Sequence, residues 1–147
     1  MPKAIIIYET RKGKTKLIAE AIQEGMEQSG VEVLLKRISD VDVGELADYT
    51  CVVLGSPTYH KDMMQTMKTF LFKLEQSNLK GKIGAAFGAY GWSGEAVEMI
   101  SETMKHIFGM DVLEPKDKLV GTPNEFGQGQ YREFGRKIAD KIREHGK

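Results

Sequence analysis

The sequence has little of the chemistry that marks secreted or metal-binding proteins. Its single cysteine, Cys51, cannot form an internal disulfide and opens an apolar run, so we expect a buried thiol in a reducing compartment. Three histidines, His60, His106 and His145, lie far apart and show no metal-ligand spacing. No apolar run approaches bilayer length, and the first one is too short for a signal-peptide core. We therefore expect a cytoplasmic protein with no membrane contact and no metal site.

The sequence also lacks an excess of positive or negative charge. The 147 residues contain 21 basic and 21 acidic side chains, so the formal net charge is zero and nothing favours nucleic acid as a partner. The length is that of one domain with a sizeable core. Because no repeat, linker or low-complexity segment interrupts it, we expect residues 1–147 to form a single domain.

Short apolar runs alternate with amphipathic segments along the whole chain. Strands are predicted over residues 4–8, 31–35, 51–54, 83–87 and 111–120, the last one bent at Pro115. Helices are predicted from the turn after residue 15 to Ser29, from Asp62 to Leu74, from Ser93 to Phe108, and around Tyr131 to Ile142. This pattern predicts a three-layer α/β domain, with helices on both faces of a five-stranded parallel sheet. The expected strand order is 2-1-3-4-5.

The turn between the first strand and the first helix has the chemistry of an anion site. It reads Thr10-Arg11-Lys12-Gly13-Lys14-Thr15, and the free amides and dipole of a helix N-terminus favour negative charge. An ordinary turn with solvated lysines is the alternative. A triphosphate loop of the Walker type is disfavoured, because its first glycine would fall at Tyr8. The dinucleotide pattern GxGxxG is absent from the turn.

Two further loops follow the third and fourth strands, and in the expected strand order all three loops meet at one edge of the sheet. The second loop carries Pro57, Thr58, Tyr59 and His60, and the third is a glycine-rich turn around Trp92. Aromatic side chains can stack on a flat ring, although Trp92 could instead cover a hydrophobic edge. A phosphate turn beside two aromatic walls predicts a planar ligand with one phosphate. Flavin mononucleotide (FMN) fits this description better than ATP or NAD.

Three segments carry a resemblance to a known family. They are Thr10 to Thr15, Gly55-Ser56-Pro57-Thr58-Tyr59, and the run from Phe87 to Gly94. Over nearly its whole length the sequence resembles the flavodoxins, and most closely the flavodoxin-like FMN domain of the A-type flavoproteins, or flavo-diiron proteins. The resemblance implies that the first loop binds the FMN phosphate, that Trp92 stacks on the flavin ring, and that residues 57–60 lie along its other face. The candidate cofactor-binding residues are Thr10, Arg11, Lys12, Gly13, Lys14, Thr15, Ser56, Pro57, Thr58, Tyr59, His60, Gly88, Ala89, Tyr90, Gly91, Trp92 and Gly94.

The resemblance implies electron transfer between redox partner proteins, with no catalytic side chain and no metal. The main alternative is an FMN-dependent NAD(P)H:quinone reductase, although no insertion provides a second-substrate pocket. A receiver-type signalling domain would need paired acidic residues at the end of the first strand and an aspartate at the end of the third, which Tyr8-Glu9 and Gly55-Ser56 do not supply. A cofactor-free interaction module would bind no flavin. The metal domain of the flavo-diiron proteins has no counterpart in this length of chain.

Two features depart from the usual flavodoxin pattern. The chain is neutral where flavodoxins are usually acidic, and basic residues flank the expected site, so we expect the fully reduced, anionic flavin to form more easily. His60 stands where short-chain flavodoxins often have a glycine. A non-glycine residue disfavours a peptide flip at this position, so we expect less stabilisation of the one-electron-reduced flavin.

Overall fold

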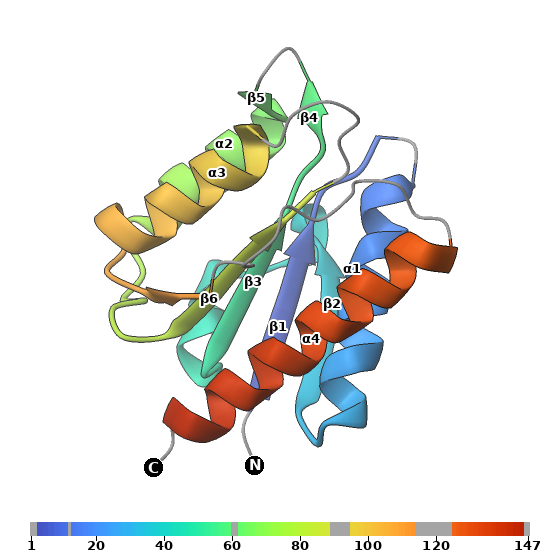
Figure 1. Ribbon diagram of the computed structural model, residues 1–147. Coiled ribbons are helices and arrows are strands. Elements are labelled where there is room, and N and C mark those ends of the chain that lie inside the picture. Colours follow the sequence, from blue (N-terminus) through green and yellow to red (C-terminus); the bar gives the residue numbers. More distant parts are fainter. Residues whose placement is uncertain (1–2, 12, 60–61, 89–94, 114–124, 146–147) are drawn as a thin grey trace.

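The computed structural model describes residues 3–11, 13–59, 62–88, 95–113 and 125–145. A central sheet lies between two helical layers, with α1 and α4 on one face and α2 and α3 on the other (Figure 1). The elements in chain order are β1 (Lys3–Tyr8), α1 (Lys14–Gln28), β2 (Glu32–Arg37), the 3-10 turns η1 (Ile38–Asp40) and η2 (Val43–Asp48), β3 (Cys51–Gly55), β4 (Thr58–Tyr59), β5 (Asp62–Met63), α2 (Gln65–Leu74), β6 (Ile83–Phe87), α3 (Glu95–Glu102), the π turn η3 (Thr103–Ile107), β7 (Asp111–Val112) and α4 (Glu125–His145).

The main sheet has five parallel strands in the order β2-β1-β3-β6-β7. Counted as parallel strands alone, this is the predicted order 2-1-3-4-5, so the fold prediction is confirmed. β1 and β3 lie inside the sheet, and their residues from Ala4 to Tyr8 and from Cys51 to Gly55 are buried. Strands covered on both faces read as continuous apolar runs, which is why the sequence identifies them.

One predicted helix start is wrong. Asp62 and Met63 form β5 and pair antiparallel with β4, and α2 begins only at Gln65. Met64 has an extended backbone, and its amide donates to the buried hydroxyl of Ser56 at 3.1 Å. This bond fixes the extended segment before the helix.

Two hydrophobic cores fill the spaces above and below the sheet. On the α1–α4 side, a side chain at Gly25 would overlap the carbonyl oxygen of Arg132, and one at Gly135 would overlap that of Ile22. On the α2–α3 side the core includes four methionines, Met63, Met67, Met104 and Met110. In the sequence, Met63 and Met67 share an apolar stripe with Phe70 and Leu74, a pattern that favours core packing, and both methionines are buried in this core.

Two side chains test the burial predictions at single positions. Cys51 is fully buried, as predicted for a structural thiol, and burial raises its pKa to about 12. In the sequence, Leu17 is part of the apolar helical spacing of the first helix, which predicts a buried position, but 44% of Leu17 is exposed. The buried stripe of α1 runs through Ile18, Ile22 and Met26, and Leu17 lies at its margin.

Within the described residues, β7 pairs with β6 at Asp111 and Val112, and the Leu113 amide donates to the Gly84 carbonyl at 2.8 Å. Residues 114–120 of the predicted fifth strand, including Pro115, lie outside the described residues, as does Ser93, the predicted start of the third helix.

Candidate functional site

Three segments meet at the carboxyl edge of the sheet, as the strand order predicts. The Glu9 amide at the end of β1 donates to the Gly55 carbonyl at the end of β3, at 3.0 Å. The Ser56 amide donates to the Phe87 carbonyl at the end of β6, at 3.2 Å. A side chain at Gly88 would overlap the Ser56 carbonyl oxygen, so the backbone there can approach closely only because residue 88 is glycine.

In the first loop, Thr10 accepts a hydrogen bond within the turn, and Gly13 is the residue at which helix α1 begins. The Gly13 amide donates to Oγ1 of Thr10 at 2.9 Å. Gly13 has a φ of 87° and is the N-cap of α1, a left-handed conformation that favours glycine. The helical hydrogen bonds start with the Leu17 amide and the Gly13 carbonyl at 3.2 Å. The amides of residues 14–16 precede this bond, at the end of the helix that attracts anions.

Thr15 supplies the clearest sign that the turn is built for a polar ligand. Only 1% of the residue is exposed, and its hydroxyl oxygen has no hydrogen-bond partner among the described residues. A buried hydroxyl without a partner costs free energy. The first turn of α1 contains no acidic residue, and Lys14 is exposed there. The residues present therefore fit a phosphate group.

Glu9 and Arg37 are polar residues at this edge that the sequence patterns did not single out. Arg37 Nε lies 2.8 Å from Oε1 of Glu9, which also accepts from the Thr10 amide at 3.0 Å. Burial alone would raise the pKa of Glu9, but hydrogen bonds from Thr10, Thr66 and Arg37 outweigh it and hold the pKa below its ordinary value. A sequence signal exists: Glu9 directly follows the first predicted strand, and Arg37 comes two residues after the second.

The second loop uses its hydroxyl groups within the protein. Ser56 Oγ donates to the Pro57 carbonyl at 3.0 Å and accepts from the Met64 amide. Thr58 Oγ1 accepts from the Ala96 amide in the first turn of α3 at 3.2 Å. These two candidates therefore shape the loop and tie the β4–β5 hairpin to α3. The backbone of Tyr59 belongs to β4, and Pro57 is buried.

Several candidate site residues, including most of the aromatic ones, lie outside the described residues. They are Lys12, His60, Ala89, Tyr90, Gly91, Trp92 and Gly94. Their roles, including the stacking of Trp92, stay predictions. Within the described ranges, no group of three or more histidine, cysteine, aspartate or glutamate residues is arranged to hold a metal.

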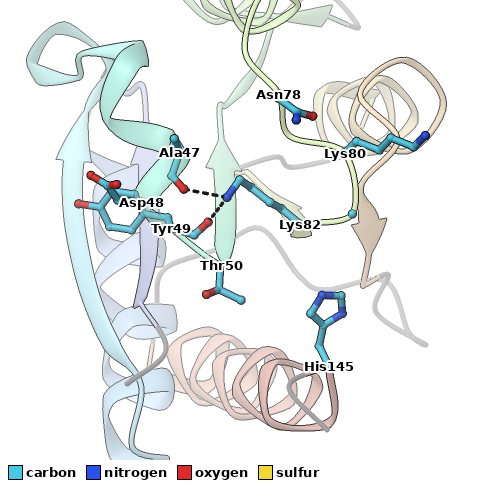
Figure 2. A pocket seen from close by; sticks show the side chains of 9 residues that line it. Ala47, Asp48, Tyr49, Thr50, Asn78, Lys80, Lys82 and His145 are labelled. Atoms are coloured by element: carbon cyan, nitrogen blue, oxygen red, sulfur yellow. Dashed lines mark hydrogen bonds between the residues drawn. The ribbon is translucent and has the colours of Figure 1, made fainter.

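A cavity of about 550 Å³ lies at the opposite end of the sheet, between η2 and the start of β6. Figure 2 shows Lys82 reaching across it, where Nζ donates to the carbonyls of Ala47 and Tyr49. Lys80 and His145 also line the cavity. Because Lys82 is bound to backbone oxygens and none of the predicted site residues is present, this cavity is separate from the candidate site.

The comparisons with known proteins decide the family. The family model described as flavodoxin matches residues 6–134, which is most of the chain. The chain belongs to the flavodoxin family. A solved flavodoxin from the domain Archaea is 39% identical, with a TM-score of 0.89, over 96% of this chain and 99% of that one. Membership of the flavodoxin family implies a flavin cofactor.

Curated relatives of this flavodoxin-family chain are of two kinds. The flavodoxin of Maridesulfovibrio salexigens is 31% identical, and the match covers 97% of this chain and all of that protein. The nitric oxide reductase of Moorella thermoacetica is 34% identical over 95% of this chain, but over only 36% of its own length. The chain thus spans about a third of several curated relatives that it matches. No helix in the described parts of the chain is long and apolar enough to cross a membrane.

Proposed function

We propose that the chain is an FMN-binding electron carrier. The observation that carries the proposal is the buried Thr15 hydroxyl at an anion-attracting helix start, which has no hydrogen-bond partner in the part of the chain that the structure describes. The chain also matches the whole length of the Maridesulfovibrio flavodoxin. FMN, rather than flavin in general, is proposed because the turn offers donors for one phosphate.

The chain's own groups would hold this cofactor at the first loop. The Thr15 hydroxyl and the amides that precede the first helical bond would donate to phosphate oxygens, and Lys14 would add positive charge. Gly88 and the second loop would face the ring system from the ends of β3 and β6. The bound flavin would supply one- and two-electron redox chemistry. In this proposal no side chain acts as a catalytic acid, base or nucleophile.

Electrons would pass between redox partner proteins at the carboxyl edge of the sheet. We propose that residues 1–147 form one domain and act as a carrier rather than as a turnover enzyme. The relatives include a protein named nitric oxide reductase, so an activity assay belongs in the test. Steady-state oxidation of NADH or NADPH with a quinone should be negligible for the FMN-loaded chain, and robust turnover would contradict the carrier role.

The decisive experiment is a flavin titration followed by visible absorption. FMN should bind at one equivalent per chain, and stepwise dithionite reduction should bleach the bound flavin reversibly. Thr15→Val removes the hydroxyl while preserving the shape of the side chain, so it should weaken FMN binding by about tenfold. A protein that takes up no FMN under any condition would refute the proposed function while leaving the family assignment intact.

A redox titration of the loaded chain tests the role assigned to His60. His60→Gly should move the two one-electron potentials apart, because glycine permits the peptide flip that histidine disfavours. Unchanged potentials in this variant would contradict that role.

A further inference from the structure

The peptide groups of Thr10 are held on both sides by one ion pair. Oε1 of Glu9 accepts from the Thr10 amide at 3.0 Å, and Arg37 Nη2 donates to the Thr10 carbonyl at 3.1 Å. Arg37 Nε closes the ring with Oε1 of Glu9 at 2.8 Å. Three hydrogen bonds thus fix the first residue of the phosphate turn in position and orientation.

The pair joins parts of the chain that are distant in sequence. Glu9 follows β1, and Arg37 is the last residue of β2, paired in register with Tyr8. Thr66, in the first turn of α2, lines the same cavity as Glu9 and helps to hold the pKa of Glu9 below its ordinary value. The start of the turn is therefore anchored to the ends of two neighbouring strands.

This anchoring reaches the phosphate donors through Thr10. Its hydroxyl accepts from the Gly13 amide, and Gly13 in its left-handed conformation sets the direction in which α1 begins. Thr15 lies in the first turn of that helix. A shift of Thr10 would therefore move the amides and the hydroxyl that face the proposed phosphate.

The positive charge of Arg37 compensates the negative charge of Glu9 at this site. Glu9 is 7% exposed, and a buried carboxylate beside an anion site would repel phosphate and be costly to desolvate. Arg37 compensates that charge, and roughly half of its side chain is exposed. Arg37 can therefore be substituted without leaving a cavity in the hydrophobic core.

We propose that Glu9 and Arg37 are positioning residues that hold the first loop in its phosphate-accepting form and so determine the preference for FMN over riboflavin. This inference rests on the proposed function. Riboflavin has the same ring and side chain as FMN but lacks the phosphate. A loop that serves only the phosphate should therefore affect FMN alone, whereas a general scaffold role would affect both flavins.

The test compares two variants of Arg37 by measuring dissociation constants for FMN and riboflavin. Arg37→Met should weaken FMN binding by tenfold or more, since it strands the Glu9 carboxylate and frees the Thr10 carbonyl. Arg37→Lys keeps the charge but not the forked geometry, so it should lose several-fold. Riboflavin affinity should change by less than about twofold in both variants.

Arg136→Met is the matched control. The guanidinium of Arg136 bonds to Gln28 of α1 and Glu133 of α4, away from the first loop. This variant should leave both affinities unchanged. An equal loss for FMN and riboflavin in Arg37→Met would overturn the positioning role. Full FMN affinity in Arg37→Lys would do so too, because charge alone would then suffice. If the unmodified chain bound riboflavin and FMN equally, the inference would fail while a flavin-carrier function survived; if it bound neither, both would fail.

Discussion

The two faces of the sheet are packed in different ways. On the α1–α4 face the helix backbones touch directly, at Gly25 and Gly135. On the α2–α3 face the contacts are made by long side chains, with methionines from β5, α2, η3 and the segment before β7. Direct backbone contact leaves no room for an added methyl group, whereas methionine can adapt to a changed neighbour.

This difference follows the division of the proposed site. The phosphate turn leads into α1, on the face with close helix contact. The second loop and its hairpin are tied to α2 and α3, through Met64 and Ala96. We infer that the phosphate end of the site is built on the less adaptable face and that the ring end is built on the more adaptable one.

The largest expected effect comes from adding a methyl group where the helices touch. Gly25→Ala should lower the free energy of unfolding by about 3 kcal/mol, because the new Cβ overlaps the Arg132 carbonyl oxygen and the helices must separate. Gly129→Ala in α4 is the control, since among the described residues its Cβ would meet only the end of the Arg132 side chain, at 4.0 Å. Urea denaturation should show that variant as neutral or slightly stabilised. Equal stability of the two variants would mean that the helix contact tolerates a methyl group.

A smaller effect is expected where glycine relieves strain without close contact. Gly13→Ala should lower the free energy of unfolding by about 1–2 kcal/mol, because φ is 87°, although no atom of another described residue lies within 4 Å of the new Cβ. Gly30, with φ of 90° and equally open space, is the matched control at the other end of α1. Both variants should lose similar stability in urea, but only Gly13→Ala should weaken FMN binding. Equal FMN affinity in the two variants would argue against a phosphate role for the first loop.

The methionine face should tolerate a change of shape. Met67→Leu conserves volume in a fully buried position, so its cost should stay below about 1.5 kcal/mol. Thermal and urea unfolding of Met67→Leu beside Gly25→Ala measure the contrast directly. A loss as large as that of Gly25→Ala would show that the two faces are equally strict.

The smallest expected effect is the reaction of Cys51 with a thiol reagent in the folded protein. It lies in the core of the α1–α4 face, and burial raises its pKa to about 12, so a thiol reagent should not react with it at neutral pH. Reaction should follow unfolding in urea, and Gly25→Ala should accelerate it. Rapid labelling of the unmodified chain would show that this face opens easily.

The sequence predicts the sheet well because strands buried on both faces form unbroken apolar runs. It does not predict the β4–β5 hairpin, because two residues are too few to show the alternating hydrophobic pattern of a strand. In addition, Met63 and Met67 are spaced as on one face of a helix. The proposed phosphate turn could be predicted because it is a local sequence pattern, from Thr10 to Thr15. The bond between Glu9 and Arg37 was not, because it joins positions 28 residues apart and depends on the register of β1 against β2.

The two ends of the described chain lie far from the proposed cofactor. The Thr50 amide donates to the Lys3 carbonyl at the start of β1, and Thr50 and His145 line the same cavity at the amino edge of the sheet. Figure 1 shows β1 beginning and α4 ending at this edge, while the β4–β5 hairpin lies at the other. A polypeptide attached at either end would join the domain at the edge opposite the proposed electron-transfer edge. The same geometry allows this fold to serve as an exchangeable module, as in relatives where it makes up about a third of a longer chain.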